Sequence, residues 1–308
     1  MKILVVRRDN IGDLVCTTPL IAGLRAAHPK AWIGALVNTY NAEVLARNPA
    51  LDAVHAYEKI KHRRGSIVSN LLERLRLRSH LRSAALDAVL VPSASRQALR
   101  LARGLRPGQV ISESSGVHEV ERAFSLGAAL GVEGTPGPMR VFPDPAIVEK
   151  LRERIGEGFI AVHISARRAA QRWPLERYQG LINELTKTSR VVLLWAPGPQ
   201  SDPRHPGDDA AASRLSAMSN LVKLPTPDLG TLIGALSLAR LAICPDGGAM
   251  HLSAALGKPI VALFGDSPAE RWRPWGVPHR VLQPDSRDLA SLQAQQVLDA
   301  CKALAPSE

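Results

Sequence analysis

Residues 241–264 have the sequence LAICPDGGAMHLSAALGKPIVALF. The apolar run that ends at Cys244 predicts a buried strand, and Pro259–Phe264 predicts a second one. Between them, a turn with two glycines leads into a helix over 249–256. Strands that alternate with helices form parallel sheets whose two faces are covered by the helices. This stretch therefore predicts an α/β fold.

The same alternation extends along the whole 308-residue chain, which is long enough for two domains. Further strands are expected at 2–7, 31–37, 52–56, 87–91, 108–111, Phe159–His163, Val191–Trp195 and Leu221–Lys223, and further helices at 175–187, 208–218 and 228–237. We therefore expect two Rossmann-like domains facing a central cleft, residues 1–145 and 146–308, joined near Phe142–Pro145. One option for the last helix, at about 286–304, is to pack back on the first domain.

The first long helix is expected from about Asp13 to His28, and it contains Pro19. Proline lacks the N–H group that a helix interior requires, so this position predicts a kink or a restart. In a restart, Thr18 would be the N-cap and Pro19 the first helical residue.

The chain is strongly basic, with 39 Lys and Arg against 28 Asp and Glu and a formal net charge of +11. Such a field attracts nucleic acid, an anionic membrane surface or a phosphorylated substrate, and composition does not choose among them. No apolar stretch has the length that crosses a bilayer, and the short N-terminal apolar run ends in charge, unlike a signal peptide.

The three cysteines, Cys16, Cys244 and Cys301, are far apart and lack the spacing of zinc or redox motifs. We expect buried free thiols, which fits a reducing cytoplasm.

The first candidate site is the turn after the first strand, Asn10–Asp13. Open α/β sheets bind ligands beyond the carboxyl ends of their strands. Gly12 permits a tight turn and the close approach of a ligand, and Asp13 presents a carboxylate at that edge. The alternative is that Asp13 only caps the following helix.

The second candidate site is the glycine turn of the opening stretch. A helix N-terminus with bare backbone N–H groups, here beside Gly247 and Gly248, binds a pyrophosphate readily. His251 could donate to a phosphate, and Asp246 could accept from sugar hydroxyls. In the alternative, Asp246 is the N-cap and His251 is a packed histidine.

The third candidate site is HISARRAAQRWP, residues 163–174, again between a strand and a helix. Its polar side chains would stabilise a departing nucleoside diphosphate; they are Ser165, Arg167, Arg168 and Arg172. The alternative is a solvated basic loop in which Trp173 serves packing.

The fourth candidate is a basic run in which Glu73 is the only acid between positions 59 and 82. It contains Lys59, Lys61, Arg63 and Arg64, then Arg74, Arg76, Arg78 and Arg82 on an expected helix at about 66–83. A solvated helix face is the usual interpretation. The run lacks aromatic residues for base stacking, which argues against nucleic acid and favours a phosphorylated or carboxylated acceptor bound by the first four of these residues.

Several kinds of site are missing from the sequence. It has no phosphate-loop motif, no Gly-x-Gly-x-x-Gly after the first strand and no Asp-x-Asp or histidine-rich set for a metal. We therefore expect no metal and no cofactor. A transferase without a metal would have to neutralise a leaving diphosphate with Arg, Lys, His and helix dipoles.

Four motifs, in order along nearly the whole chain, resemble glycosyltransferase family 9, the heptosyltransferases. They are Gly12-Asp13 followed by Thr17-Thr18-Pro19-Leu20, then His118-Glu-Val-Glu-Arg122, then Arg172-Trp-Pro-Leu-Glu-Arg-Tyr178, and finally Asp246-Gly-Gly-Ala-Met-His251 with Ala254-Ala-Leu-Gly-Lys-Pro259.

The resemblance implies a GT-B fold and metal-independent transfer with inversion at the anomeric carbon. Asp13 would be the general base, and the donor diphosphate would lie near Gly247, Gly248 and His251, with Gly12 also at the donor site. The usual donor is ADP-L-glycero-D-manno-heptose. The usual acceptor is the lipopolysaccharide inner core, Kdo-lipid A or its heptosylated form, reached by peripheral contact with the cytoplasmic face of the inner membrane.

The sequence departs from the family pattern at several positions around the donor site. Gln171 lies in the stretch where members often carry a lysine before Trp-Pro, and Gly247 replaces a usual threonine. Two alternatives therefore stay open. One is a GT-B enzyme that uses another nucleotide sugar or a protein acceptor, and the other is a non-catalytic nucleotide-sugar-binding protein.

Overall fold

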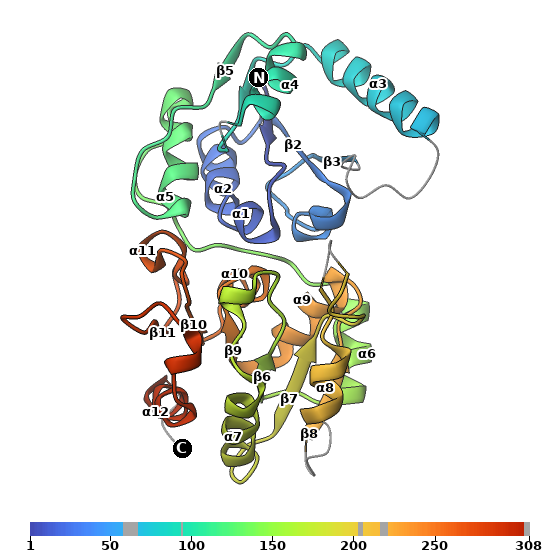
Figure 1. Cartoon of the computed structure of the whole chain (residues 1–308). Coiled ribbons are helices and arrows are strands. Elements are labelled where there is room, and N and C mark those ends of the chain that lie inside the picture. The colour runs from blue at the N-terminus through green and yellow to red at the C-terminus, as the bar shows by residue number, and fades with distance from the viewer. Residues whose placement is uncertain (58–66, 94, 203–205, 216–220, 305–308) are drawn as a thin grey trace. The chain divides into compact units, whose positions relative to one another are not determined.

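The computed structural model describes residues 1–57, 67–93, 95–202, 206–215 and 221–304. They form two compact units, Met1–Phe142 and Pro143–Glu308, each with its own sheet (Figure 1). The division falls within the linker expected at 142–145. Within the described ranges, no helix has both the length and the apolar character that a bilayer span requires.

The first unit contains a five-stranded, all-parallel sheet in the order β3-β2-β1-β4-β5. Its strands are β1 (Lys2–Val6), β2 (Trp32–Asn38), β3 (Ala53–Tyr57), β4 (Ala88–Leu90) and β5 (Gln109–Ile111). Its helices are α1 (Ile11–Val15), α2 (Thr18–Ala27), η1 (Thr39–Val44), α3 (Ile67–Ser83), α4 (Arg96–Gly104), α5 (Glu119–Phe124) and η3 (Ser125–Leu130). Helix α2 packs with α5 and η3, and α3 and α4 contribute to a separate apolar cluster against the sheet.

The second unit contains a six-stranded parallel sheet in the order β11-β10-β9-β6-β7-β8. Its strands are β6 (Phe159–His163), β7 (Val191–Trp195), β8 (Leu221–Pro225), β9 (Ala239–Pro245), β10 (Ile260–Leu263) and β11 (His279–Leu282). Its helices are α6 (Pro145–Ile155), η4 (Ala169–Gln171), α7 (Leu175–Leu185), α8 (Asp209–Leu215), α9 (Leu229–Leu238), α10 (Gly248–Ala255), α11 (Ala269–Trp272), η5 (Leu289–Ser291) and α12 (Ala294–Leu304). The predicted α/β class with parallel sheets is confirmed in both units.

The structure corrects two details of the sequence-based assignment. The first long helix restarts as predicted, but its N-cap is Thr17 rather than Thr18, so that Thr18 is already helical. Strand β11 was not predicted, because it is short and only half-buried. Helix α12 packs against α7, β10 and β11 of its own unit, since its apolar face completes that unit's core.

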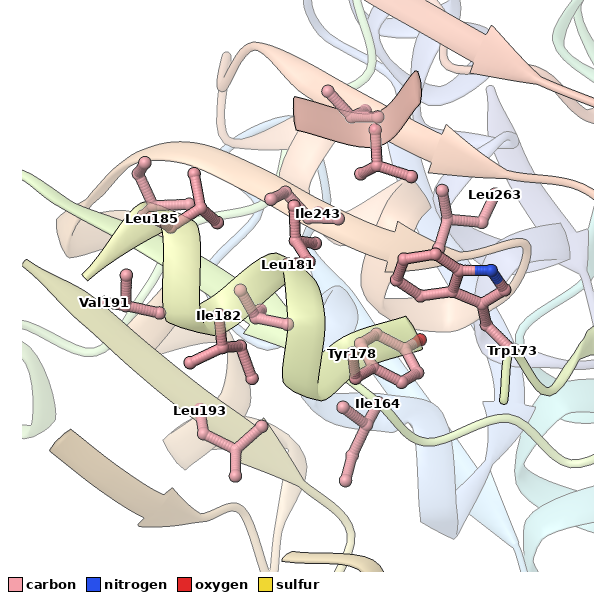
Figure 2. Packing of buried hydrophobic residues seen from close by; sticks show 14 of the residues in the cluster. Ile164, Trp173, Tyr178, Leu181, Ile182, Leu185, Val191, Leu193, Ile243 and Leu263 are labelled. Carbon is pink, nitrogen blue, oxygen red and sulfur yellow. The ribbon is translucent and has the colours of Figure 1, made fainter. Parts of the chain in front are cut away.

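The core of the second unit is built around α7. Figure 2 shows Leu181, Ile182 and Leu185 of this helix against strand residues of the sheet. Trp173 and Tyr178 lie edge to face, with ring centroids 4.8 Å apart. The Trp173 indole N–H donates to the Leu292 carbonyl over 3.0 Å, so this tryptophan serves packing, as the alternative interpretation of its loop proposed.

All three cysteines are buried and free, as predicted. Burial raises the pKa of the Cys244 thiol to about 12 and that of Cys301 to about 12.

Candidate functional site

Strand order identifies the edge of each sheet at which a ligand is expected. In the first sheet the chain order reverses between β1 and β4, and in the second between β6 and β9. Open α/β sheets bind ligands at the carboxyl ends of the strands at such a reversal. The segments that follow β1, β6 and β9 are the first three of the four candidate sites found in the sequence.

In the first unit, a buried arginine organises the end of β1. Arg7 Nη2 donates to Asp13 Oδ1 over 2.8 Å and to Glu119 Oε1 over 2.6 Å. Arg7 Nε lies 3.1 Å from a carboxylate oxygen of Asp9. One guanidinium is therefore shared among three carboxylates from two parts of the unit.

The environment keeps Arg7 charged although the side chain is only 2% exposed. Burial opposes the charge, but the carboxylates of Asp13, Glu119 and Asp9 outweigh that effect and raise the pKa of this guanidinium. Arg7 Nη1 is buried without a hydrogen-bond partner. Since a rigid ion pair fixes both members, the Asp13 carboxylate has a defined position.

Asp13 takes part in capping the following helix, as one interpretation of its sequence position proposed. Its Oδ2 accepts from the backbone N–H and the side-chain amide of Asn10, each over 3.1 Å, so it does close the start of α1. Its side chain is nevertheless 15% exposed. Gly12 is buried within α1, and its carbonyl accepts from Cys16 N–H.

Sequence reasoning missed Arg7 and Glu119. The signal for Arg7 was a charge directly after an apolar strand. Glu119 lies in the His118–Arg122 element, where His118 is buried and caps α5 through Nδ1, which accepts from Val120 N–H. Arg7 and Glu119 are 112 positions apart, so no local pattern could pair them.

In the second unit, α10 begins directly after β9 without a side-chain cap. Its N-cap is Gly247, and a Cβ atom built there would meet no atom within 4 Å. Asp246 is therefore not the N-cap, contrary to the alternative interpretation. The first N–H groups of this helix remain the natural donors for an anion. His251 is buried one turn further along, with its ring edge-on to Trp272 at 6.0 Å.

The Asp246 carboxylate is held by the loop after β6. Gln171 Nε2 donates to Asp246 Oδ2 over 2.8 Å and to Ser267 Oγ over 3.3 Å. The loop after β6 also touches the loop after β10. A Cβ atom on Gly265 would lie only 2.0 Å from the Ala170 carbonyl oxygen. The second and third candidate sites are therefore one site, at the carboxyl ends of β6, β9 and β10.

The arginines of the third candidate site differ in their surroundings. Arg168 is exposed and pairs with Asp266, whereas Arg172 pairs with the buried Asp208. Arg167 is exposed on the same loop. Ser165 Oγ accepts from Ala196 N–H over 2.8 Å and so joins the loop to the end of β7. The charge of Arg172 is thus partly neutralised within the protein.

His163, the last residue of β6, is buried. Its Nδ1 and the Tyr178 hydroxyl are buried without hydrogen-bond partners. Burial lowers the pKa of His163 to about 4, although Asp208 acts in the opposite direction. The imidazole is therefore neutral at physiological pH.

The four residues predicted to bind the acceptor, Lys59, Lys61, Arg63 and Arg64, lie outside the described residues. Within the described ranges, no group of three or more His, Cys, Asp or Glu side chains is placed to hold a metal ion.

Comparison with known proteins gives consistent results. Residues 75–302 match the model of glycosyltransferase family 9 (heptosyltransferase). Lipopolysaccharide heptosyltransferase 3 of Escherichia coli is 23% identical, over 86% of this chain and 83% of the relative. A glycosyl transferase family 9 structure from Veillonella parvula has a TM-score of 0.84 at 20% identity, covering 98% of this chain and 96% of that one. The structure of E. coli heptosyltransferase WaaC with ADP has a TM-score of 0.79 at 21% identity, covering 99% and 100%.

The family model spans most of the chain, and the structural matches extend over both α/β units. The chain therefore belongs to glycosyltransferase family 9 (heptosyltransferase) and is a glycosyltransferase of the GT-B fold.

Proposed function

We propose that this enzyme transfers heptose from ADP-L-glycero-D-manno-heptose to the lipopolysaccharide inner core, Kdo-lipid A or its heptosylated form, with inversion and without a metal. Family membership supports a heptosyltransferase. The similarity to lipopolysaccharide heptosyltransferase 3 and to an ADP-bound heptosyltransferase supports this acceptor class and an ADP-sugar donor.

The observation that carries the proposal is the geometry of Asp13. Its carboxylate lies at the carboxyl end of β1, is fixed by Arg7 and Asn10, and stays partly exposed. In the proposed reaction it takes the proton of the acceptor hydroxyl while that oxygen attacks the anomeric carbon opposite the leaving ADP. A general base of this kind contributes on the order of 10² to 10⁴ in rate.

The donor diphosphate is proposed to bind at the uncapped start of α10, against Gly247 and Gly248 and near His251. Negative charge on the leaving ADP grows in the transition state, so donors fixed at that point lower the barrier. Arg167 and Arg168, with Ser165 and Arg172 at the base of their loop, are proposed to add positive charge beside the diphosphate. The helix N-terminus supplies further attraction without any metal.

Asp246 is proposed to bind hydroxyl groups of the donor sugar. Gln171 occupies one carboxylate oxygen of Asp246, which leaves the other as an acceptor. Because a glutamine amide is neutral, it orients the carboxylate without neutralising it, unlike the lysine that family members often carry in this stretch.

The acceptor is proposed to bind through Lys59, Lys61, Arg63 and Arg64, whose charges suit carboxylates and phosphates. The enzyme is proposed to act in the cytoplasm, in peripheral contact with the inner membrane, where such an acceptor would be presented.

The test of the base is Asp13→Asn, assayed with ADP-heptose and the acceptor in the presence of a metal chelator. We expect turnover to fall by at least about 10²-fold with ADP affinity nearly unchanged. Asp9→Asn is the matched control, because it removes a carboxylate from the same Arg7 and should reduce turnover far less. Equal losses in the two variants would contradict the role of Asp13 as the base.

The test of the donor is calorimetric titration with ADP, UDP and GDP. Binding of ADP alone would support an ADP-sugar. Preference for UDP or GDP would retain the transferase but exclude ADP-heptose. This second possibility is favoured by the Gln171 and Gly247 departures, which lie at the donor site. Binding of none, together with no transfer, would favour a non-catalytic protein.

A further inference from the structure

The first unit contains a pocket of about 290 Å³ beside the segment that carries Asp13. Arg8 and Tyr57 line it from the carboxyl ends of β1 and β3, and Arg74 lines it from α3. This is the edge of the sheet at which an open α/β unit binds ligands. The proposed transfer mechanism assigns no role to any of these three residues.

Two positive charges meet on the polar side of the pocket. The guanidinium carbons of Arg8 and Arg74 lie 4.4 Å and 5.3 Å from the centre of the Tyr57 ring. Burial and repulsion from Arg74 lower the pKa of Arg8, and Arg8 Nε is buried without a hydrogen-bond partner. The neighbouring carboxylate of Asp9 acts on the pKa of Arg8 in the opposite direction, and one of its oxygens also lies 3.1 Å from Arg7 Nε. An oxyanion held by both arginines would relieve this repulsion.

The other side of the pocket is apolar. Leu36 of β2, Leu81 of α3 and Leu105 after α4 are buried and form its floor. Leu75 lines the outer part and is 52% exposed, and Leu72 on the same helix is 47% exposed. These exposed leucines place apolar surface beside the arginines of the same helix.

We infer that this pocket binds a phosphate-bearing membrane lipid, with the phosphate between Arg8 and Arg74 and the adjoining apolar part of the lipid over the leucine floor. The volume lies at the lower end of ligand pockets, so it suits one lipid group rather than a whole glycolipid. A nucleotide base is disfavoured, because guanidinium groups already contact the Tyr57 ring. The inference rests on the proposed membrane contact and gives that contact a place on α3.

The alternative is diffuse attraction between a basic protein and an anionic surface. The chain offers a matched control for it. Arg96 and Arg100 on α4 belong to the same unit and are exposed. Arg96→Gln with Arg100→Gln removes the same net charge as Arg8→Gln with Arg74→Gln.

The experiment is flotation of the full chain with vesicles of phosphatidylcholine alone or with added phosphatidylglycerol, at several salt concentrations. We expect binding only to the anionic vesicles. Loss of Arg8 and Arg74 should weaken it at least about tenfold, and loss of Arg96 and Arg100 less than about threefold. Leu75 is exposed, so Leu75→Ser leaves the fold intact. This variant should bind the anionic vesicles more weakly, by the same factor at every salt concentration.

Two outcomes would overturn the inference. Equal weakening by the two arginine pairs would show diffuse attraction, and complete displacement from the vesicles by millimolar inorganic phosphate would show a simple anion site. Unfolding curves of each variant exclude misfolding as the cause. The assay contains neither donor nor acceptor, so its failure is separate from failure of glycosyl transfer. The Asp13→Asn variant should float like the unaltered protein.

Discussion

At the scale of single residues, the candidate site depends on charged side chains that are buried. Arg7 is the clearest case, because one buried guanidinium positions Asp13 through a hydrogen bond and is itself held by Glu119. Removing one partner of a buried pair costs more than removing an exposed one, since the remaining charge loses its compensation.

Glu119→Gln should therefore lower the free energy of unfolding by about 1–3 kcal/mol. Glu43→Gln removes a carboxylate from the exposed ion pair with Arg47 and should cost less than about 1 kcal/mol. Urea unfolding of both variants measures the difference. Equal costs would mean that Arg7 does not depend on Glu119.

His163 makes stability depend on pH. Its pKa is about 4 in the folded protein and near 6.5 when unfolded. Between these values only the unfolded chain binds the proton, so stability is full above pH 6.5 and is lost as pH falls toward 4. One pKa unit corresponds to about 1.4 kcal/mol, so the loss from this residue approaches about 3 kcal/mol.

His163→Gln removes this titration. The unfolding free energy of the variant, measured from pH 7 to pH 4, should fall less steeply than that of the unaltered protein. Parallel curves would show that another group carries the dependence.

At the scale of elements, the proposed donor site depends on contact between the loop after β6 and the loop after β10. Gly265→Ala would place a methyl group 2.0 Å from the Ala170 carbonyl, so η4 must move and carry Gln171 away from Asp246. We expect ADP affinity to fall about tenfold or more.

Gly180→Ala is the control for this change. Gly180 lies in α7, and its new methyl group would meet only Ala294 of α12 at 3.6 Å, an ordinary contact between the two helices. ADP affinity should be unchanged and stability unchanged or slightly higher, because alanine favours a helix interior. Calorimetric titration of both variants compares them. Unaltered ADP affinity after Gly265→Ala would show that donor binding does not depend on contact between the two loops.

Prediction from sequence succeeded at this scale where local patterns act. Apolar runs and glycine turns located strands such as β6 and β9, because burial and turn geometry depend on neighbouring residues. Strand β11 escaped, since a half-buried edge strand has a weak apolar pattern. The loop after β6 was located between its strand and its helix. The ion pair of Arg172 with Asp208 was not predicted, because it joins segments that only the folded chain brings together.

At the scale of the whole molecule, each unit has its own sheet and buried side chains. A ligand stabilises what it binds, by about 2.7 kcal/mol at a hundredfold excess over its dissociation constant. Since the donor diphosphate is proposed to bind mainly to the second unit, ADP should raise the midpoint temperature of one component of the calorimetric unfolding profile more than that of the other. An equal shift of both components would contradict independent cores.

The burial of Cys16, Cys244 and Cys301 has a practical consequence. For Cys244 and Cys301, the raised pKa keeps the thiol protonated at neutral pH, and a protonated thiol reacts poorly with maleimides. Cysteines introduced at exposed positions such as Arg100 and Arg154 would therefore accept fluorescent dyes selectively on an otherwise natural sequence. Energy transfer between two such dyes, one on each unit, would report changes in the distance between them while ADP is added.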